Sequence, residues 1–210
     1  MSSFEWRLSQ PDTFGSVDVA ELQALSDVLP DVVYNGCPPT APAELLDGFH
    51  NWGAAREPMV NLAQAAIEAA SQVMSLKKIG FMLLKETLEP EKHGSNPSMW
   101  HAGDDTALLL SSAPTTEFAV GAIKVPKGSK VVRLISSSAT LIPEEPDLDK
   151  DGVRVFSPNP GEFTLLKFTD VHRAPKNRTD SPIDRLFIKF DIVSSRRLVI
   201  ARQRNIYKVA

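Results

Sequence analysis

The sequence predicts a mainly β protein that begins with a few helices. Two observations carry this expectation. The first part of the chain has apolar residues at helical spacing, and from residue 79 onward short apolar runs alternate with turn signals. Sixteen prolines, many of them between apolar runs, also favour short strands and turns over long helices. Helices followed by strands predict a sheet-rich domain that the helices support from one side.

Two short helices are expected at the start of the chain. Ser16 is a candidate N-cap for the first, over residues 17–25, where apolar side chains recur every three residues. The second is expected over residues 43–52, after a loop marked by three prolines. Both are short, so packing rather than intrinsic propensity must stabilise them.

The longest helix is expected over residues 59–76. Pro58 suits its first turn, because proline has no backbone N–H to leave unpaired there. One side of this helix is an apolar stripe that must pack on another element. The stripe consists of Val60, Leu62, Ala63, Ala66, Ile67, Ala70 and Val73.

About eight short strands are expected in the rest of the chain. They are predicted over residues 79–84, 107–110, 118–123, 131–135, 153–156, 163–168, 185–192 and 198–201. Turn signals separate them, such as the Pro-Asn-Pro-Gly run that ends at Gly161. Helices followed by this many short strands are typical of a double-stranded β-helix, or jelly-roll barrel, with helices supporting one face.

The segment 185–192 shows how such a barrel would be arranged. Alternation sends one wholly apolar set of side chains to one face, and that face needs a covering helix. The other face carries Arg185, Phe187, Lys189 and Asp191, and would look into the barrel. A buried arginine costs free energy unless an anion meets it. Alternatively, Arg185 sits at the strand end and pairs with Asp184, Asp180 or solvent.

Composition bounds the class of protein. A chain of 210 residues is expected to form one domain over 1–210, with a helical support region over 1–77 and a barrel core over 78–210. The net charge of -3 gives no reason to expect nucleic acid as a partner. One cysteine, Cys37, allows no internal disulfide. No segment is long enough to span a membrane, and no apolar signal core is visible, so we expect a cytoplasmic protein.

Two histidines lie beside β-type segments in contexts that suit a metal. His101 is followed by Asp104 and Asp105, and His172 comes much later in the chain. Iron(II) that activates dioxygen needs protein ligands on one face of its octahedron, and two histidines with one carboxylate supply them. The competing interpretation is a surface histidine and a turn with two solvated acids, because Gly-Asp-Asp is common turn chemistry.

These segments carry a resemblance to a known family. Residues 171–179 (VHRAPKNRT), followed by residues 184–190 (DRLFIKF), resemble the C-terminal motif of the iron(II)/2-oxoglutarate-dependent dioxygenase superfamily. Residues 100–105 (WHAGDD) are similar to the first metal motif of that family. The resemblance spans roughly the last half of the chain, and its fold is the double-stranded β-helix.

The resemblance implies a role for each matching residue. His101, Asp104 and His172 would be the metal ligands, and Arg185 would bind the far carboxylate of 2-oxoglutarate. It further implies iron(II) and 2-oxoglutarate as cofactor and co-substrate, dioxygen as the oxidant, and succinate and carbon dioxide as products. Arginine suits this clamp because its planar fork can hold a carboxylate with two parallel bonds.

The first motif departs from the family pattern. The family usually has His-x-Asp, whereas Ala102 and Gly103 both intervene here. Gly103 can adopt an unusual backbone turn that brings Asp104 back into range. Asp104 is the expected carboxylate ligand, and Asp105 competes with it. If neither reaches the metal, the site holds metal with two histidines only, or holds none.

Three functions follow from these residues. The first is an iron(II)/2-oxoglutarate oxygenase that hydroxylates, or otherwise oxidises, a small-molecule substrate. The second is a cupin-type metalloenzyme that keeps the metal ligands but needs no arginine clamp. The third is a non-enzymatic β-barrel binding protein. The chain is short for the first class, so either the substrate is small or a second subunit, as in a homodimer, completes the pocket. Its lining is expected near Leu83, Lys85, Trp100, Phe118 and Arg133.

Overall fold

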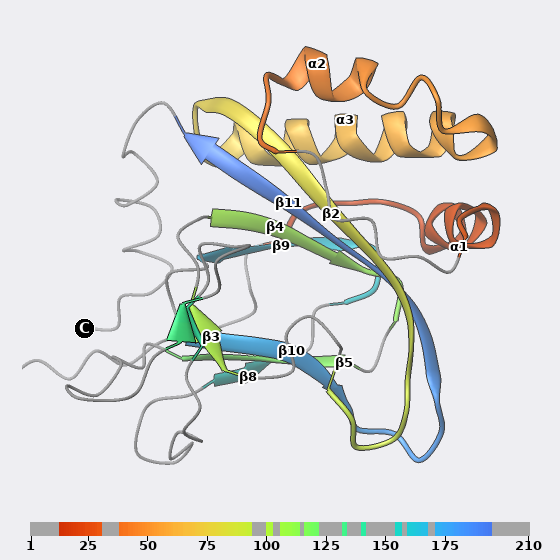
Figure 1. Ribbon diagram of the computed structural model, residues 1–210, viewed down its shortest axis with the longest axis vertical. Helices are drawn as coiled ribbons and strands as arrows, with labels where there is room; N and C mark the ends of the chain where they lie inside the picture. The colour runs from red at the N-terminus through yellow and green to blue at the C-terminus, as the bar shows by residue number, and fades with distance from the viewer. Residues whose placement is uncertain are drawn as a thin grey trace, which may run out of the picture.

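The protein folds as two antiparallel sheets with helices against one of them (Figure 1). The computed structural model describes residues 13–30, 38–93, 100–102, 106–113, 116–121, 132–133, 140–141, 154–156, 159–167 and 171–194. Every statement about structure below concerns these residues.

The first sheet has five strands. In spatial order they are β1 (Thr13–Ser16), β9 (Glu162–Lys167), β4 (Thr106–Ser111), β11 (Ile183–Ser194) and β2 (Leu76–Leu88). β11 makes the longest pairing in this sheet. It pairs with β2 along nearly its whole length and with β4 on its other side. The N-terminal β1 forms the far edge by pairing with β9.

The second sheet has six shorter strands. In spatial order they are β6 (Val132–Arg133), β7 (Thr140–Leu141), β3 (His101–Ala102), β10 (Val171–Asn177), β5 (Thr116–Gly121) and β8 (Arg154–Phe156). β10 lies between β3 and β5 and pairs with both. It therefore joins the two halves of this sheet.

The chain crosses repeatedly between the two sheets. From β2 to β5, each successive strand belongs to the opposite sheet from the one before it, and the same alternation recurs from β8 to β11. Two antiparallel sheets wound alternately in this way form a double-stranded β-helix. The predicted fold class, a β-helix barrel with helices on one face, is confirmed.

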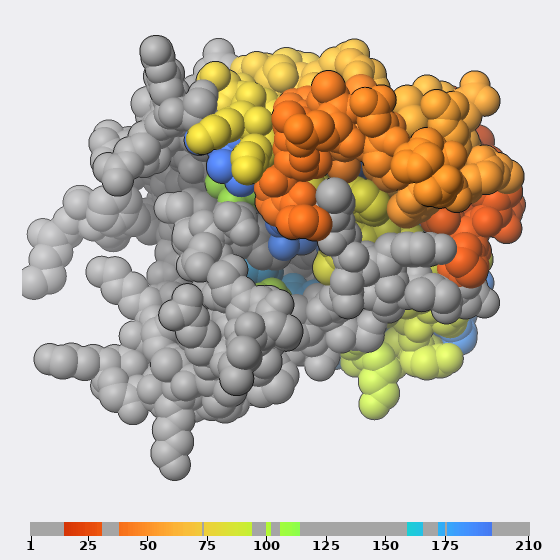
Figure 2. Space-filling view, turned by 45° about the horizontal axis from the view of Figure 1, so that its top comes forward, coloured from red at the N-terminus to blue at the C-terminus, as the bar shows by residue number. Residues whose placement is uncertain are grey.

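Three α-helices and one short 3-10 helix are found in the described N-terminal part. They are α1 (Val19–Val28), α2 (Pro42–Asp47), a 3-10 helix (Gly53–Ala55) and α3 (Arg56–Val73). None of the helices described is both long and apolar enough to cross a membrane. In Figure 2 the residues of α2 and α3, in orange, gather on one side of the molecule.

The helix boundaries differ from the expected ones for local reasons. Ser16 belongs to β1, so the N-cap of α1 is Asp18, whose carboxylate accepts a hydrogen bond of 2.8 Å from the backbone N–H of Ala20. α2 is shorter than expected and ends at Asp47. α3 begins at Arg56 and keeps Pro58 in its first turn, as predicted.

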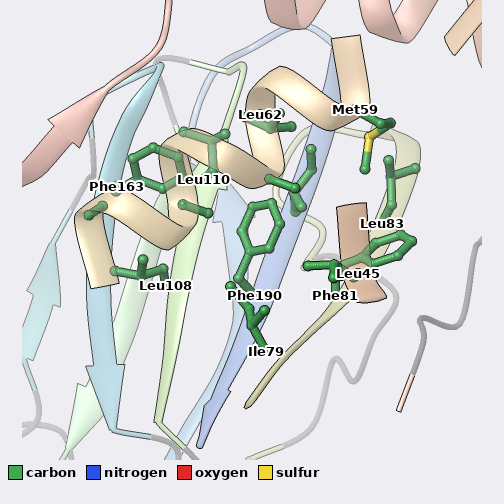
Figure 3. Packing of buried hydrophobic residues seen from close by; sticks show 14 of the residues in the cluster. Leu45, Met59, Leu62, Ile79, Phe81, Leu83, Leu108, Leu110, Phe163 and Phe190 are labelled. Atoms are coloured by element: carbon green, nitrogen blue, oxygen red, sulfur yellow. The ribbon is translucent and has the colours of Figure 1, made fainter. Parts of the chain in front are cut away.

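α3 packs on the outer face of the first sheet and forms the main core with it (Figure 3). From α3 the cluster takes Met59, Leu62, Ala63, Ala66, Ala69 and Ala70. From β11 it takes Leu186, Ile188, Phe190 and Ile192, the apolar set that alternation assigned to one face. The expectation that the long helix covers this face is confirmed. The opposite face of β11, with Arg185, consequently turns toward the second sheet.

Four strands were not expected from the sequence: β1, β3, β7 and β10. Three of them have only two to four residues, and β10 reads as a polar segment interrupted by a proline. β10 is a strand because β3 and β5 supply hydrogen-bonding partners on both sides. The strand expected over 198–201 lies outside the described residues.

Gly161 is expected to tolerate no side chain. Its φ is +77°, and a Cβ there would lie 2.4 Å from the carbonyl oxygen of Val17. The backbone is pinned at this point, since the N–H of Val17 donates to the carbonyl of Gly161 over 2.8 Å. We expect Gly161→Ala to lower the free energy of unfolding by more than about 2 kcal/mol, measured by urea denaturation.

Gly53 is the matched control for this prediction. Its φ is also positive, +55°, but a Cβ there would meet nothing within 4 Å. Gly53→Ala therefore adds only the left-handed backbone cost of about 1 kcal/mol. Equal losses in the two variants would contradict the predicted clash with Val17.

Candidate metal and anion site

The two predicted histidine ligands meet in the second sheet. β3 and β10 are neighbours, and His172 stands directly opposite His101 in their register. Side chains of directly opposed residues project to the same face of an antiparallel pair. The two ring centroids are 4.1 Å apart with an angle of 58° between the ring planes. The structure thus brings together residues that are 71 positions apart in the sequence (172 − 101).

Both histidines are buried, with exposed fractions of 6% for His101 and 3% for His172. On β10, His172 and Ala174 are buried whereas Arg173 and Lys176 are half-buried, so the histidine face is the one turned to the interior. A neutral imidazole offers one ring nitrogen as a ligand to a divalent transition metal. Two such rings side by side in the interior can therefore supply two ligands from fixed strands rather than from loops.

The carboxylate of the predicted site lies outside the described residues. Asp104 and Asp105 both fall within the undescribed stretch 103–105, between β3 and β4. In the part of the chain that is described, no group of three or more His, Cys, Asp or Glu side chains could hold a metal. Two of the three predicted ligands are thus placed together. Asp104 is three positions beyond His101 in the sequence, within about 11 Å of extended chain.

Arg185 is buried on β11, on the inner face of the first sheet. Its neighbour across the β11–β2 pair is Glu86, directly opposite in register. The Nε of Arg185 donates to Oε1 of Glu86 over 2.8 Å, and Nη2 donates to the same oxygen. The guanidinium carbon also lies 5.0 Å from the ring centroid of Phe187. Nη1 makes no hydrogen bond with any described residue.

The anion that meets Arg185 in this structure is thus a side chain of the same protein. The alternative partners considered for it, Asp184, Asp180 or solvent, are wrong. Asp184 instead accepts a hydrogen bond of 2.6 Å from the hydroxyl of Thr87. Burial lowers the pKa of Arg185 from its ordinary value, and the Glu86 carboxylate opposes that shift by charge and by hydrogen bonding.

The inner face around Arg185 combines apolar side chains with a second ion pair. Leu84, Ala107, Leu109 and Phe187 form a small buried cluster on it. The Nζ of Lys189 lies 2.7 Å from Oδ1 of Asp191, and both side chains are 20% exposed. This surface excludes water from most of its area and fixes a few charged groups within it.

Several residues expected near a pocket have other roles. Leu83 belongs to the core under α3. The Nζ of Lys85 donates to the carbonyls of Ser26 and Leu29, over 2.9 and 3.2 Å, at the C-terminal end of α1. The expectation that these two line the pocket is therefore wrong. Lysine there satisfies carbonyls that the helix leaves without partners.

Trp100 is buried beside Arg173, whose guanidinium carbon is 4.7 Å from the centroid of the indole ring. Each residue is a sequence neighbour of one of the histidines, so alternation places this pair on the face opposite to the histidine pair. Trp100 therefore packs on the face of β3 and β10 that is opposite to the histidines. The side chains of Phe118 and Arg133 lie outside the described residues.

Glu86 is the functional candidate that the sequence did not reveal. The only signal for Glu86 in the sequence was alternation along β2. It places Glu86 on the same face as Leu84 and on the opposite face from Leu83. Its partner is 99 positions away, and only the register of β2 with β11 shows that the two meet.

Several solved structures resemble this one. A cupin domain from Bordetella pertussis is 10% identical over 56% of this chain and 81% of its own, with a TM-score of 0.29. The apo form of the non-heme monooxygenase ThoJ is 9% identical over 88% of this chain and 73% of its own, with a TM-score of 0.42. EvdO2 from Micromonospora carbonacea var. aurantiaca, complexed with 2-oxoglutarate, is 13% identical over 87% of this chain and 84% of its own, with a TM-score of 0.41.

No protein-family description and no curated protein matches the sequence. With identities of 13% or less and TM-scores of 0.42 or less, these likenesses carry no argument about this protein. The assignment of the fold as a double-stranded β-helix rests on the order of the strands in the two sheets.

Proposed function

We propose that this protein is an iron(II)- and 2-oxoglutarate-dependent oxygenase that oxidises a small molecule. The observation that carries the proposal is the pair of buried histidines, His101 and His172, which lie directly opposite each other on adjacent strands. Two imidazoles on one side of a barrel leave the rest of an iron coordination sphere open, and Asp104 or Asp105 is the expected third ligand. Bound iron(II) would supply activation of dioxygen, coupled to conversion of 2-oxoglutarate to succinate and carbon dioxide.

The protein's own residues would position the reactants. His101 and His172 would hold the metal from β3 and β10, and backbone hydrogen bonds with neighbouring strands fix these two residues in place. Arg185 would bind the far carboxylate of 2-oxoglutarate from the facing sheet, through charge-assisted hydrogen bonds. The apolar side chains beside it would keep water away from the reacting centre.

A cupin-type metalloenzyme that does not use 2-oxoglutarate is the second candidate. The Arg185–Glu86 pair favours it, because the guanidinium already has a carboxylate partner. In that case the arginine would be part of the barrel's structure, and the histidines alone would define the active site.

Anaerobic titration separates these functions. Iron(II) is added to the purified protein, followed by 2-oxoglutarate, while the visible spectrum is recorded. We expect a weak charge-transfer band when 2-oxoglutarate chelates the bound iron. Iron binding without the band would favour the cupin-type enzyme. Absence of iron binding would contradict both metalloenzymes and leave a non-enzymatic β-barrel binding protein.

A further inference from the structure

The Arg185–Glu86 pair has an unequal geometry. Two nitrogens of the guanidinium, Nε and Nη2, converge on one oxygen, Oε1 of Glu86. Nη1 is the remaining donor group of the fork and makes no hydrogen bond with a described residue. Nη1 is itself buried, so a carboxylate from outside does not reach it directly. The two-pronged position beside the more exposed member of the pair is the Nε and Nη2 edge that Glu86 occupies, so a ligand carboxylate takes it by displacing Glu86.

The two members of the pair also differ in burial. The side chain of Arg185 is 1% exposed, and that of Glu86 is 10% exposed. Arg185 is held further by Phe187, whose ring lies against the guanidinium. Glu86 is thus the member that can turn toward water, while Arg185 stays in place.

Two ion pairs lie on the inner face of β11 and β2 in the described part. Arg185 is paired with Glu86, and Lys189 with Asp191. A dicarboxylate that approaches Arg185 meets a guanidinium whose charge Glu86 already neutralises. Its binding to Arg185 must therefore come from exchange with the carboxylate already there, because like charges close together repel in a poorly solvated site.

We infer that Glu86 is a specificity-determining residue, an internal competitor whose carboxylate sets how tightly Arg185 binds the carboxylate of a ligand. The inference rests on the proposed function only in taking 2-oxoglutarate as the natural ligand. Glu86 acts through Arg185, and its release accompanies binding of a dicarboxylate. A neutral side chain at position 86 would remove the competitor and leave the clamp in place.

The test compares wild type with Glu86→Gln in metal-free protein, using glutarate as the probe. Glutarate carries both carboxylates of 2-oxoglutarate but lacks the keto group that chelates iron, so it reports on the arginine alone. Calorimetry should show glutarate binding at least about tenfold tighter in Glu86→Gln. Tenfold corresponds to ~1.4 kcal/mol, near the lower end of what a hydrogen bond to a charged group contributes.

Three further variants make the result specific. Glu86→Asp keeps the charge and should keep the weak binding of wild type. Asp184→Asn removes the same charge from a neighbouring exposed site and should also match wild type. Arg185→Met added to Glu86→Gln should abolish the gain. Glu86→Gln should fold, because glutamine can still accept a hydrogen bond from Arg185. If the variant is less stable than wild type, the shift in the midpoint of thermal unfolding on adding glutarate compares the affinities of the two proteins.

Equal glutarate affinity in wild type and Glu86→Gln, or binding by neither, would overturn the inference. An equal gain in Glu86→Asp would also overturn it, because the effect would then come from space rather than charge. The outcome is separate from that of the proposed function. A gain in Glu86→Gln with no iron binding by wild type would uphold the competitor and reject the oxygenase. A charge-transfer band in wild type, without tighter glutarate binding in Glu86→Gln, would support the oxygenase and reject the competitor.

Discussion

Replacement of His172 by alanine is expected to abolish iron(II) binding. The imidazole of His172 is one of the two histidine side chains that β3 and β10 bring together, and the ring of His101 lies beside it. Loss of a partner outside the coordination sphere already costs 10–100-fold in metal affinity, so loss of a direct ligand should cost at least about 100-fold. The measurement is anaerobic calorimetry with iron(II), followed by the 2-oxoglutarate absorbance band.

His50 supplies the matched control. It is an exposed histidine after α2, where its Nδ1 lies 3.0 Å from the carbonyl oxygen of Asp47. His50→Ala removes the same chemical group from the surface and should leave iron(II) affinity unchanged. If His172→Ala kept wild-type iron affinity while folding normally, the metal would have to bind elsewhere, and the proposed function would lose its main support.

The strands and the histidine pair differed in how far the sequence could predict them. Apolar runs such as 107–110 predicted strands because burial on both faces of a sheet demands them. β10 has no such run, and it is a strand because it lies between two others. His172 was nevertheless predicted as a site residue from its motif, because a short motif can indicate chemistry where the local pattern does not indicate secondary structure. That it faces His101 follows from register, which no local pattern encodes.

For Arg185, the sequence predicted the face of the strand but not the partner of the side chain. Alternation along β11 correctly separated its apolar face from its mixed face, and it predicted that a helix covers the former. The partner of Arg185 could not be derived in the same way, because Glu86 lies 99 positions earlier and reaches it through strand pairing. A buried charge therefore predicts that some counter-charge exists, but the fold decides whether a ligand or the chain itself supplies it.

The stability of Arg185→Met is expected to reveal how much the barrel depends on this pair. Removing the guanidinium leaves the Glu86 carboxylate in a site where it is only 10% exposed, without the cation that compensates its lost hydration. Breaking a buried ion pair from one side costs about 3–5 kcal/mol, and we expect a loss of about 3 kcal/mol in the free energy of unfolding in urea. Lys189→Met is the comparison, since its pair with Asp191 is 20% exposed on both sides and should contribute about 1 kcal/mol or less.

The double variant Arg185→Met/Glu86→Met separates stability from function at this pair. Two apolar side chains of similar volume often replace a buried ion pair without net loss, so most of the stability lost in Arg185→Met should return. Binding of glutarate should not return, because no cation remains to hold it. If the double variant were as unstable as Arg185→Met, the cost would come from lost packing against Phe187 rather than from an uncompensated carboxylate. Recovery of stability without binding would instead mean that the barrel folds equally well without these charges, and that the arginine serves a ligand.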